Sequence, residues 1–154
     1  MIRIRSATAK DESLIASIIR ASMLASYAHF LPAHQFQKVL DMDRPGQVAR
    51  ADAVLFVVAE VDAVPAGVML LKGNYVDHLW AHPDFMGQGV GSVLLGHAER
   101  LAAEAGYDRL TLDCFKKNKK ALAFYRARGF TLKSTYEAND YLPGEPTCSL
   151  VKDL

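Results

Sequence analysis

The chain has 154 residues, of which 51% are hydrophobic and 23% are charged, and its 18 Lys and Arg against 17 Asp and Glu give a formal net charge of +1. This composition is that of a globular protein and excludes a disordered or collagen-like chain. A charge so close to zero gives no reason to expect a nucleic-acid-binding surface. We therefore expect one domain over residues 1–154, built around a single hydrophobic core.

The location of the protein is predicted from its apolar segments and its cysteines. The longest apolar run, residues 53–59, is far shorter than the roughly 20 residues that cross a bilayer, so we expect no membrane association. Arginines interrupt the first apolar stretch, which argues against a signal peptide. Cys114 and Cys148 are too few for a disulfide framework and lack metal-type spacing, so we expect buried thiols in a cytoplasmic protein.

The hydrophobic pattern predicts a mixed α/β chain that begins with antiparallel hairpins and continues with strand–helix–strand crossovers. The expected strands cover residues 2–6, 53–59, 66–71, 75–81, 110–114, 130–136 and 147–151. The expected helices cover residues 11–27, 34–42, 90–105 and 118–128, and the Arg44-Pro45-Gly46 sequence is expected to end the second of them. The strand over residues 53–59 is apolar throughout, which is typical of burial on both faces.

A glycine-rich stretch, Gly87-Gln88-Gly89-Val90-Gly91, lies between a predicted strand and a predicted helix. Such a loop brings several backbone N–H groups together at a helix N-terminus, and that arrangement suits a phosphate or pyrophosphate. The stretch is not a Walker loop, because Ser92 and Val93 follow its last glycine. A Rossmann loop also fits poorly, since five residues, 82–86, separate the strand from the first glycine.

Two segments resemble motifs of the GCN5-related N-acetyltransferases. The segment Leu79-Trp-Ala-His-Pro-Asp-Phe-Met-Gly-Gln-Gly-Val-Gly-Ser-Val-Leu-Leu95 resembles their acetyl-CoA motif, which reads Arg or Gln, two residues, Gly, one residue, then Gly or Ala. The segment from Asn118 to Phe130 resembles a second motif, in which Asn, Ala, Tyr and Gly-Phe recur at this spacing. One departure is Met86, which stands where the family has Arg or Gln, and we expect it to weaken cofactor affinity by removing a side-chain contact.

The resemblance implies the GNAT acyl-CoA N-acyltransferase fold, an α/β domain of three αβα layers with a splayed, mixed sheet. It also implies an acetyl-CoA-dependent N-acetyltransferase that transfers the acetyl group directly, in a ternary complex, to a primary amine. A small-molecule acceptor is favoured over a peptide or protein. One alternative is a non-catalytic acyl-CoA-binding sensor. Another is a toxin that acetylates aminoacyl-tRNA, although a near-neutral chain suits a phosphate-rich substrate poorly. The family suggests a homodimer, but no motif in this sequence requires one.

The resemblance assigns roles to individual residues. The backbone of Leu79 and Ala81 would pair with the pantetheine arm, and amides from Met86 through Ser92 would hold the pyrophosphate. Tyr125 matches the family's general acid, and its phenol has an intrinsic pKa near that of a thiol. The general base stays open between Asp77, which is favoured, His78 and a chain of waters. The predicted cofactor-binding residues are Leu79, Trp80, Ala81, Met86, Gly87, Gln88, Gly89, Val90, Gly91, Ser92, Asn118, Ala121, Phe124 and Tyr125.

The acceptor is expected to bind near Tyr27, His29 and Phe30 and the late loop of residues 137–145, because variable loops usually set specificity. Aromatic residues of these regions could wall a pocket, fill the core or form a dimer surface: Tyr27, Phe30, Phe36, Tyr136 and Tyr141. The basic cluster Lys116, Lys117, Lys119 and Lys120 is expected to be solvated, with one or two lysines meeting the 3′-phosphate of CoA. No metal is expected, since His78, His82 and His97 lack zinc-type spacing, and Cys114 has no activating neighbour that would make it a nucleophile.

Overall fold

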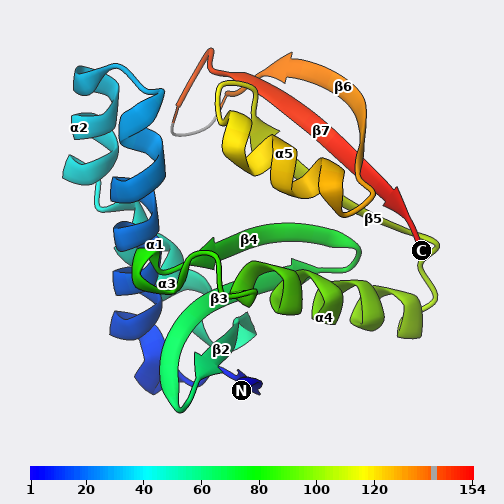
Figure 1. The fold of residues 1–154 in the computed structure, drawn as a ribbon. Coiled ribbons are helices and arrows are strands. Elements are labelled where there is room, and N and C mark those ends of the chain that lie inside the picture. The colour runs from blue at the N-terminus through cyan, green and yellow to red at the C-terminus, as the bar shows by residue number, and fades with distance from the viewer. Residues whose placement is uncertain (140–141) are drawn as a thin grey trace.

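The computed structural model describes residues 1–139 and 142–154. Their strands form one sheet in the order β1-β2-β3-β4-β5-β7-β6, in which β4 and β5 are parallel and the other neighbours are antiparallel (Figure 1). The strands are β1 (Ile2–Ser6), β2 (Val57–Val61), β3 (Val64–Lys72), β4 (Tyr75–Ala81), β5 (Arg109–Phe115), β6 (Thr131–Glu137) and β7 (Pro146–Asp153).

Helices cover both faces of the sheet and give it three layers, as the resemblance implied. The helices are α1 (Glu12–Ser26), α2 (Ala33–Asp41), α3 (Arg44–Asp52), α4 (Val90–Glu104) and α5 (Lys119–Ala127). Side chains alternate along β3, so Val68 and Leu70 pack with α1, α2 and α3, whereas Met69 packs with α4 and α5 on the opposite face. Within the described part of the chain, no helix is long and apolar enough to cross a membrane.

The strand expected over residues 53–59 was wrong at its start. Residues Ala53–Leu55 form a 3₁₀ turn, and Val54 and Leu55 are 62% and 56% exposed. Phe56 is the first residue of this run that is fully buried with the α1–α3 core, and the strand begins after it at Val57. An apolar run by itself does not show where the backbone becomes extended.

The second helix ends at Asp41, before the Arg44-Pro45-Gly46 sequence as expected, but this sequence also starts a further helix, α3. Asp43 precedes α3 in a left-handed conformation, with φ at 49°, and its carboxylate accepts a hydrogen bond of 3.3 Å from the Gly46 N–H. Proline is well suited to the first turn of a helix, where its missing N–H would have no partner. The extra helix α3 lies against α1 and supplies one side of the cleft described below.

The sheet opens between β4 and β5. These strands pair only at Tyr75 with Thr111 and at Val76 with Leu112. Asp77 is the extra residue of a bulge, because His78 pairs with Leu70 of β3 while Val76 pairs with Leu71. From Asp77 to Ala81, β4 has no strand on its β5 side, while β5 continues along β7. The predicted splay is therefore present, and Figure 1 shows the two strands diverging.

Candidate functional site

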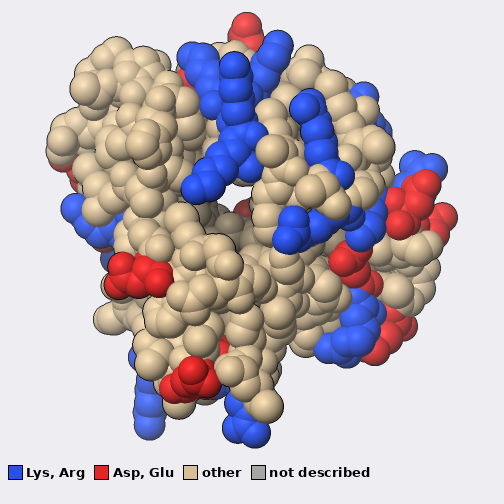
Figure 2. Space-filling view, viewed as in Figure 1, with Lys and Arg blue, Asp and Glu red and all other residues tan. Residues whose placement is uncertain are grey.

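A cavity of about 1340 Å³ occupies the opening between β4 and β5. Residues of α1, α3, β4, β5, α5 and the first turn of α4 line it, and Figure 2 shows it as the hollow at the middle of the molecule. Pockets for one small ligand usually measure about 300–1,000 Å³. The cavity therefore has room for more than one small substrate.

The glycine-rich loop places open amides at one end of this cavity. The Met86 and Gln88 N–H groups donate to the Pro83 and Phe85 carbonyls at 3.2 and 3.3 Å, so the loop itself uses two of the expected donors. The N–H groups of Gly89, Val90, Gly91 and Ser92 have no acceptor among the residues that the structure describes. They lie at the N-terminus of a 15-residue helix, α4, where the helix dipole also favours an anion.

Most of the predicted cofactor residues line the cavity; the exception is Gln88, whose side chain is exposed and donates to the Asp84 carbonyl at 3.4 Å. Gly91 permits a close contact between α4 and α5, because a Cβ there would lie 3.1 Å from Cζ of Phe124. Asn118 caps α5 by accepting a hydrogen bond of 3.3 Å from the Ala121 N–H. The second motif thus sets the position of α5 against the glycine-rich loop.

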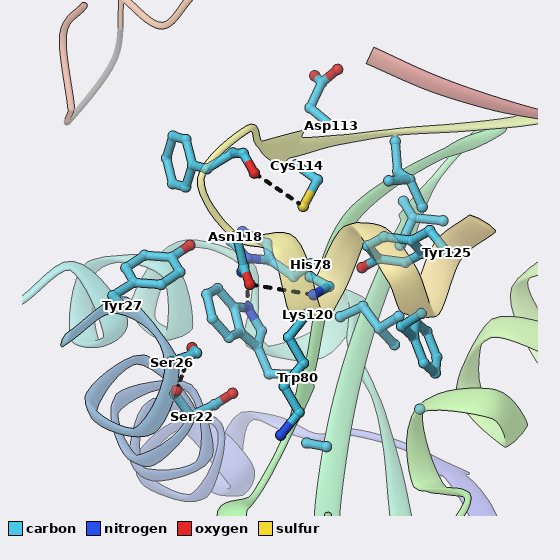
Figure 3. Close-up of a pocket in the computed structure, with 18 of the residues that line it drawn as sticks. Ser22, Ser26, Tyr27, His78, Trp80, Asp113, Cys114, Asn118, Lys120 and Tyr125 are labelled. Atoms are coloured by element: carbon cyan, nitrogen blue, oxygen red, sulfur yellow. Dashed lines mark hydrogen bonds between the residues drawn. The ribbon is translucent and has the colours of Figure 1, made fainter. Parts of the chain in front are cut away.

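Tyr125 lies on α5 with its hydroxyl directed into the cavity (Figure 3). Its ring packs edge-on against Phe124 and Phe130, at centroid distances of 5.3 and 5.7 Å. Burial raises the pKa of Tyr125 well above its ordinary value, with a further contribution from Cys114. The phenol therefore stays protonated at neutral pH and can donate a proton.

A lysine stands between two carboxylates at the α3 side of the cavity. The ammonium of Lys72 lies 3.2 Å from a carboxylate oxygen of Asp77 and 3.5 Å from one of Asp52. The hydrogen bond to Asp77 is the main cause that raises the pKa of Lys72. All three residues line the cavity. Sequence reasoning found Asp77 and missed Asp52 and Lys72, because it did not predict α3.

His78 is a weaker candidate for the base than Asp77. Its Nδ1 accepts a hydrogen bond of 3.1 Å from the indole N–H of Trp80, which is drawn as a dashed line in Figure 3. Burial is the main cause that lowers the pKa of His78. Its Nε2 lies 3.9 Å from Asp77, beyond hydrogen-bond distance. The lone pair with which a neutral imidazole would accept a proton is therefore already engaged.

The predicted acceptor residues divide between the cavity wall and the core. Tyr27, His29 and Phe30 line the cavity, and the Tyr27 ring lies 5.8 Å from that of Trp80. Phe36 packs in the core formed by α1, α2 and α3. Tyr136 lines the cavity, and Tyr141 lies outside the described residues.

Cys114 and Cys148 are both buried free thiols and lie opposite each other on β5 and β7. Burial raises the pKa of Cys114 to about 12, and its Sγ donates a hydrogen bond of 3.6 Å to the Phe115 carbonyl. A thiol in this state is a poor nucleophile. Among the described residues, no three His, Cys, Asp or Glu side chains converge as metal ligands.

Basic side chains surround the α5 side of the cavity (Figure 2). Lys117, Lys119 and Lys120 line it, whereas Lys116 does not. Lys117 also forms a 3.4 Å ion pair with the buried Glu145 and so links the β5–α5 turn to the segment before β7. The sequence analysis did not single out several further lining residues, which are Ser22, Ser26, Arg44, Gln47, Asp52, Lys72, Tyr75 and Arg128.

Comparison with known proteins identifies the family. The model of the acetyltransferase (GNAT) family matches residues 18–130. The chain is 28% identical, over 151 residues and 98% of both chains, to the peptidyl-lysine N-acetyltransferase YjaB of Salmonella typhimurium. The solution structure of apo YjaB from Escherichia coli is similar with a TM-score of 0.78 at 28% identity, covering 98% of this chain and 97% of that one. A GCN5-related N-acetyltransferase from Rhodopseudomonas palustris has a TM-score of 0.85 at 27% identity, covering 99% and 95%. The chain therefore belongs to the GNAT family and is an N-acetyltransferase.

Proposed function

We propose that this enzyme transfers the acetyl group of acetyl-CoA directly to the side-chain amine of a lysine in a peptide or protein. The sequence alone favoured a small-molecule amine. Similarity to a peptidyl-lysine N-acetyltransferase along 98% of the chain now favours lysine. The ion pairs of Lys72 inside the cavity provide a second, independent reason.

Acetyl-CoA supplies the thioester that is attacked. Its pantetheine arm would lie along the part of β4 that has no β5 partner, against the backbone of Leu79 and Ala81. The open amides of Gly89 through Ser92 would bind the pyrophosphate, and Lys119 or Lys120 could reach the 3′-phosphate. The residues present fit this ligand, because they offer an extended backbone edge, unpaired N–H donors and a basic rim in one cavity.

The transfer needs a proton acceptor for the amine and a proton donor for the thiolate. The bound ammonium first loses one proton to solvent, and the neutral amine nitrogen then forms a bond to the thioester carbonyl carbon while the carboxylate of Asp77 takes a second proton from that nitrogen. The carbon–sulfur bond then breaks, and the Tyr125 hydroxyl gives its proton to the departing sulfur. Asp77 is left protonated and Tyr125 ionised, and exchange with solvent restores both. The raised pKa of Tyr125 makes its anion a strong base that is quickly reprotonated.

The observation that carries the choice of acceptor is the position of Lys72. Its ammonium contacts Asp77, the proposed base, and Asp52 at 3.2 and 3.5 Å inside the cavity. An alkylammonium group on a four-carbon chain thus already fits between these carboxylates. A lysine side chain of a substrate has the same chemistry and would bind there by displacing Lys72.

The test is an acetylation assay with matched acceptors. Peptides with blocked N-termini that contain lysine, the same peptides with arginine instead, spermidine and an aminoglycoside are each incubated with acetyl-CoA and enzyme. We expect CoA thiol release with the lysine peptides, and mass spectrometry should place the acetyl group on the side-chain nitrogen. The Lys72→Arg variant shows whether any release comes from self-acetylation.

Release only with spermidine or the aminoglycoside would return the proposal to a small-molecule acceptor. Equal release with the lysine and arginine peptides would contradict side-chain transfer. CoA binding without release from any amine would contradict the proposed acceptors and leave the cofactor site intact.

A further inference from the structure

Arg128 connects the end of α5 to the start of α4. It is the residue that follows α5, and its Nε donates a hydrogen bond of 2.9 Å to Oγ of Ser92, which its Nη2 also contacts. Its Nη1 donates to the Phe124 carbonyl at 3.3 Å, and its guanidinium carbon lies 3.9 Å from the centroid of the Phe124 ring. Arg128 is half-buried, and both Arg128 and Ser92 line the cavity. The guanidinium is therefore fixed beside the glycine-rich loop.

The charge of this guanidinium is not neutralised by the protein. No carboxylate of the described residues forms an ion pair with Arg128, and the oxygens that it contacts are neutral. Ser92 is the third residue of α4, so the cation lies at the helix end that carries positive partial charge. The four open amides of Gly89 through Ser92 are also donors. A group of donors with one uncompensated positive charge favours an anion.

The glycine-rich loop has no cation of its own. From Pro83 to Ser92 it contains no Lys or Arg, and Met86 stands where the GNAT acetyl-CoA motif has Arg or Gln. Met86 lines the cavity and is 40% exposed, so a side chain at this position faces the same space. Position 86 and position 128 thus approach one phosphate-binding site from different elements.

We propose that Arg128 binds the diphosphate of acetyl-CoA and supplies, from α5, the side-chain contact that Met86 does not make. This inference rests on the proposed use of acetyl-CoA. On this proposal Met86 does not weaken the site, because Arg128 would make the contact that the methionine lacks. Phe124 and Ser92 position the guanidinium, and the diphosphate takes the Nη hydrogens that these two residues leave unused.

The test compares ligands that lack one phosphate group each. CoA, dephospho-CoA, which lacks the 3′-phosphate, and pantetheine, which lacks the diphosphate, are titrated calorimetrically into the wild type and the Arg128→Met variant. We expect the variant to bind CoA and dephospho-CoA about 10- to 100-fold more weakly, as for a lost charged hydrogen bond. Pantetheine affinity should change by less than about 2-fold, because pantetheine lacks the diphosphate that Arg128 is proposed to contact.

The matched control is Arg126→Met, in the last turn of α5, whose side chain is exposed and does not line the cavity. It should bind all three ligands as the wild type does. The decisive second variant is Met86→Arg in the Arg128→Met background, which returns a cation to the loop and should restore most of the lost CoA affinity. Thermal unfolding of each variant checks that it folds.

Unchanged dephospho-CoA binding by Arg128→Met would overturn the proposal. An equal loss for pantetheine would also overturn it, because it would indicate a structural role. A loss confined to CoA would assign Arg128 to the 3′-phosphate instead. These titrations contain no acceptor, so a failure to acetylate lysine would reject the proposed function without affecting this result, whereas no CoA binding by the wild type would reject both.

Discussion

The indole N–H of Trp80 is hydrogen-bonded to Nδ1 of His78 at 3.1 Å, two residues away on the same strand. The His78 ring also stacks against Trp80 and lies 5.6 Å from Phe56. Burial and this hydrogen bond both favour the neutral imidazole, because protonation of Nδ1 would break the hydrogen bond. His78 therefore helps to orient Trp80, which lines the cavity.

His78 should make the folded state sensitive to acid. Burial lowers its pKa below the ordinary value of 6.5, so the unfolded chain binds this proton first as the pH falls. The contribution of neutral His78 to the free energy of unfolding is complete above about pH 6.5. It is lost as the pH falls from there toward the lower pKa that His78 has in the folded state. Urea unfolding between pH 5 and 8 should show a steeper acid loss for the wild type than for His78→Phe. Parallel curves would contradict this assignment.

Tyr125→Phe should lower kcat by about 10² or more, the usual size of a general acid contribution. Affinity for CoA should stay within about 2-fold, since the hydroxyl is assigned to proton transfer and not to binding. Steady-state kinetics and calorimetry measure the two effects separately. The control is Tyr107→Phe, because Tyr107 is 43% exposed and does not line the cavity. Unchanged kcat in Tyr125→Phe would exclude it as the acid.

Asp77→Asn should lower kcat by about 10²–10⁴, because it removes the proposed base. His78→Gln should cost far less, since the Nδ1 lone pair of His78 is already engaged. Asp52→Asn removes the other carboxylate beside Lys72 and should raise the acceptor KM with little change in kcat. A larger kcat loss for His78→Gln than for Asp77→Asn would reverse the assignment of the base.

Lys72→Met should improve acceptor binding. The Lys72 ammonium competes with an incoming amine for Asp52 and Asp77, at 3.5 and 3.2 Å. These ion pairs are partly exposed, so removing Lys72 should lower the acceptor KM only by about 2- to 5-fold. The KM for acetyl-CoA should not change. A raised acceptor KM would mean that Lys72 holds the carboxylates in place for the substrate.

Gly67→Ala should destabilise the fold by about 1–3 kcal/mol through overpacking. A Cβ at Gly67 would lie 2.6 Å from Cγ1 of Val90 and 3.0 Å from the Trp80 carbonyl oxygen, so β3 and α4 would have to separate.

Gly96→Ala should have the opposite effect on stability. Gly96 is exposed within α4 and a Cβ there meets nothing within 4 Å, so the helix should gain about 0.5–1 kcal/mol. Thermal or urea unfolding compares the two variants.

The sequence motifs located the cavity residues of the glycine-rich loop and α5 but missed the charged residues on the α3 side. The amides, the close approach at Gly91 and the position of Tyr125 follow from short-range motifs, in which spacing determines local geometry. Asp52 ends α3 and Lys72 ends β3, and the two meet only in the folded chain, where α3 packs against α1. Pro45 and Gly46 were interpreted as a helix end, although Asp43 followed by proline in the first turn is also a sequence signal for a helix start.

Arg128 shows a second limit of sequence reasoning. A motif records which residue stands at each of its own positions, so Met86 was interpreted as a lost contact. The folded chain brings an arginine from the next helix to the same loop. The role proposed for Arg128 depends on this tertiary contact, which the motif does not record.

The opening between β4 and β5 also has a mechanical consequence. The part of the sheet formed by β1–β4 and the part formed by β5–β7 share only two residue pairs, at Val76 with Leu112 and at Tyr75 with Thr111. A ligand that contacts Leu79 on one side and α5 on the other would act as a cross-link between them. Because α4 also packs on β3, β4 and β5, such a ligand would add a second connection across the opening, and we expect its binding to stiffen the two parts of the sheet against each other.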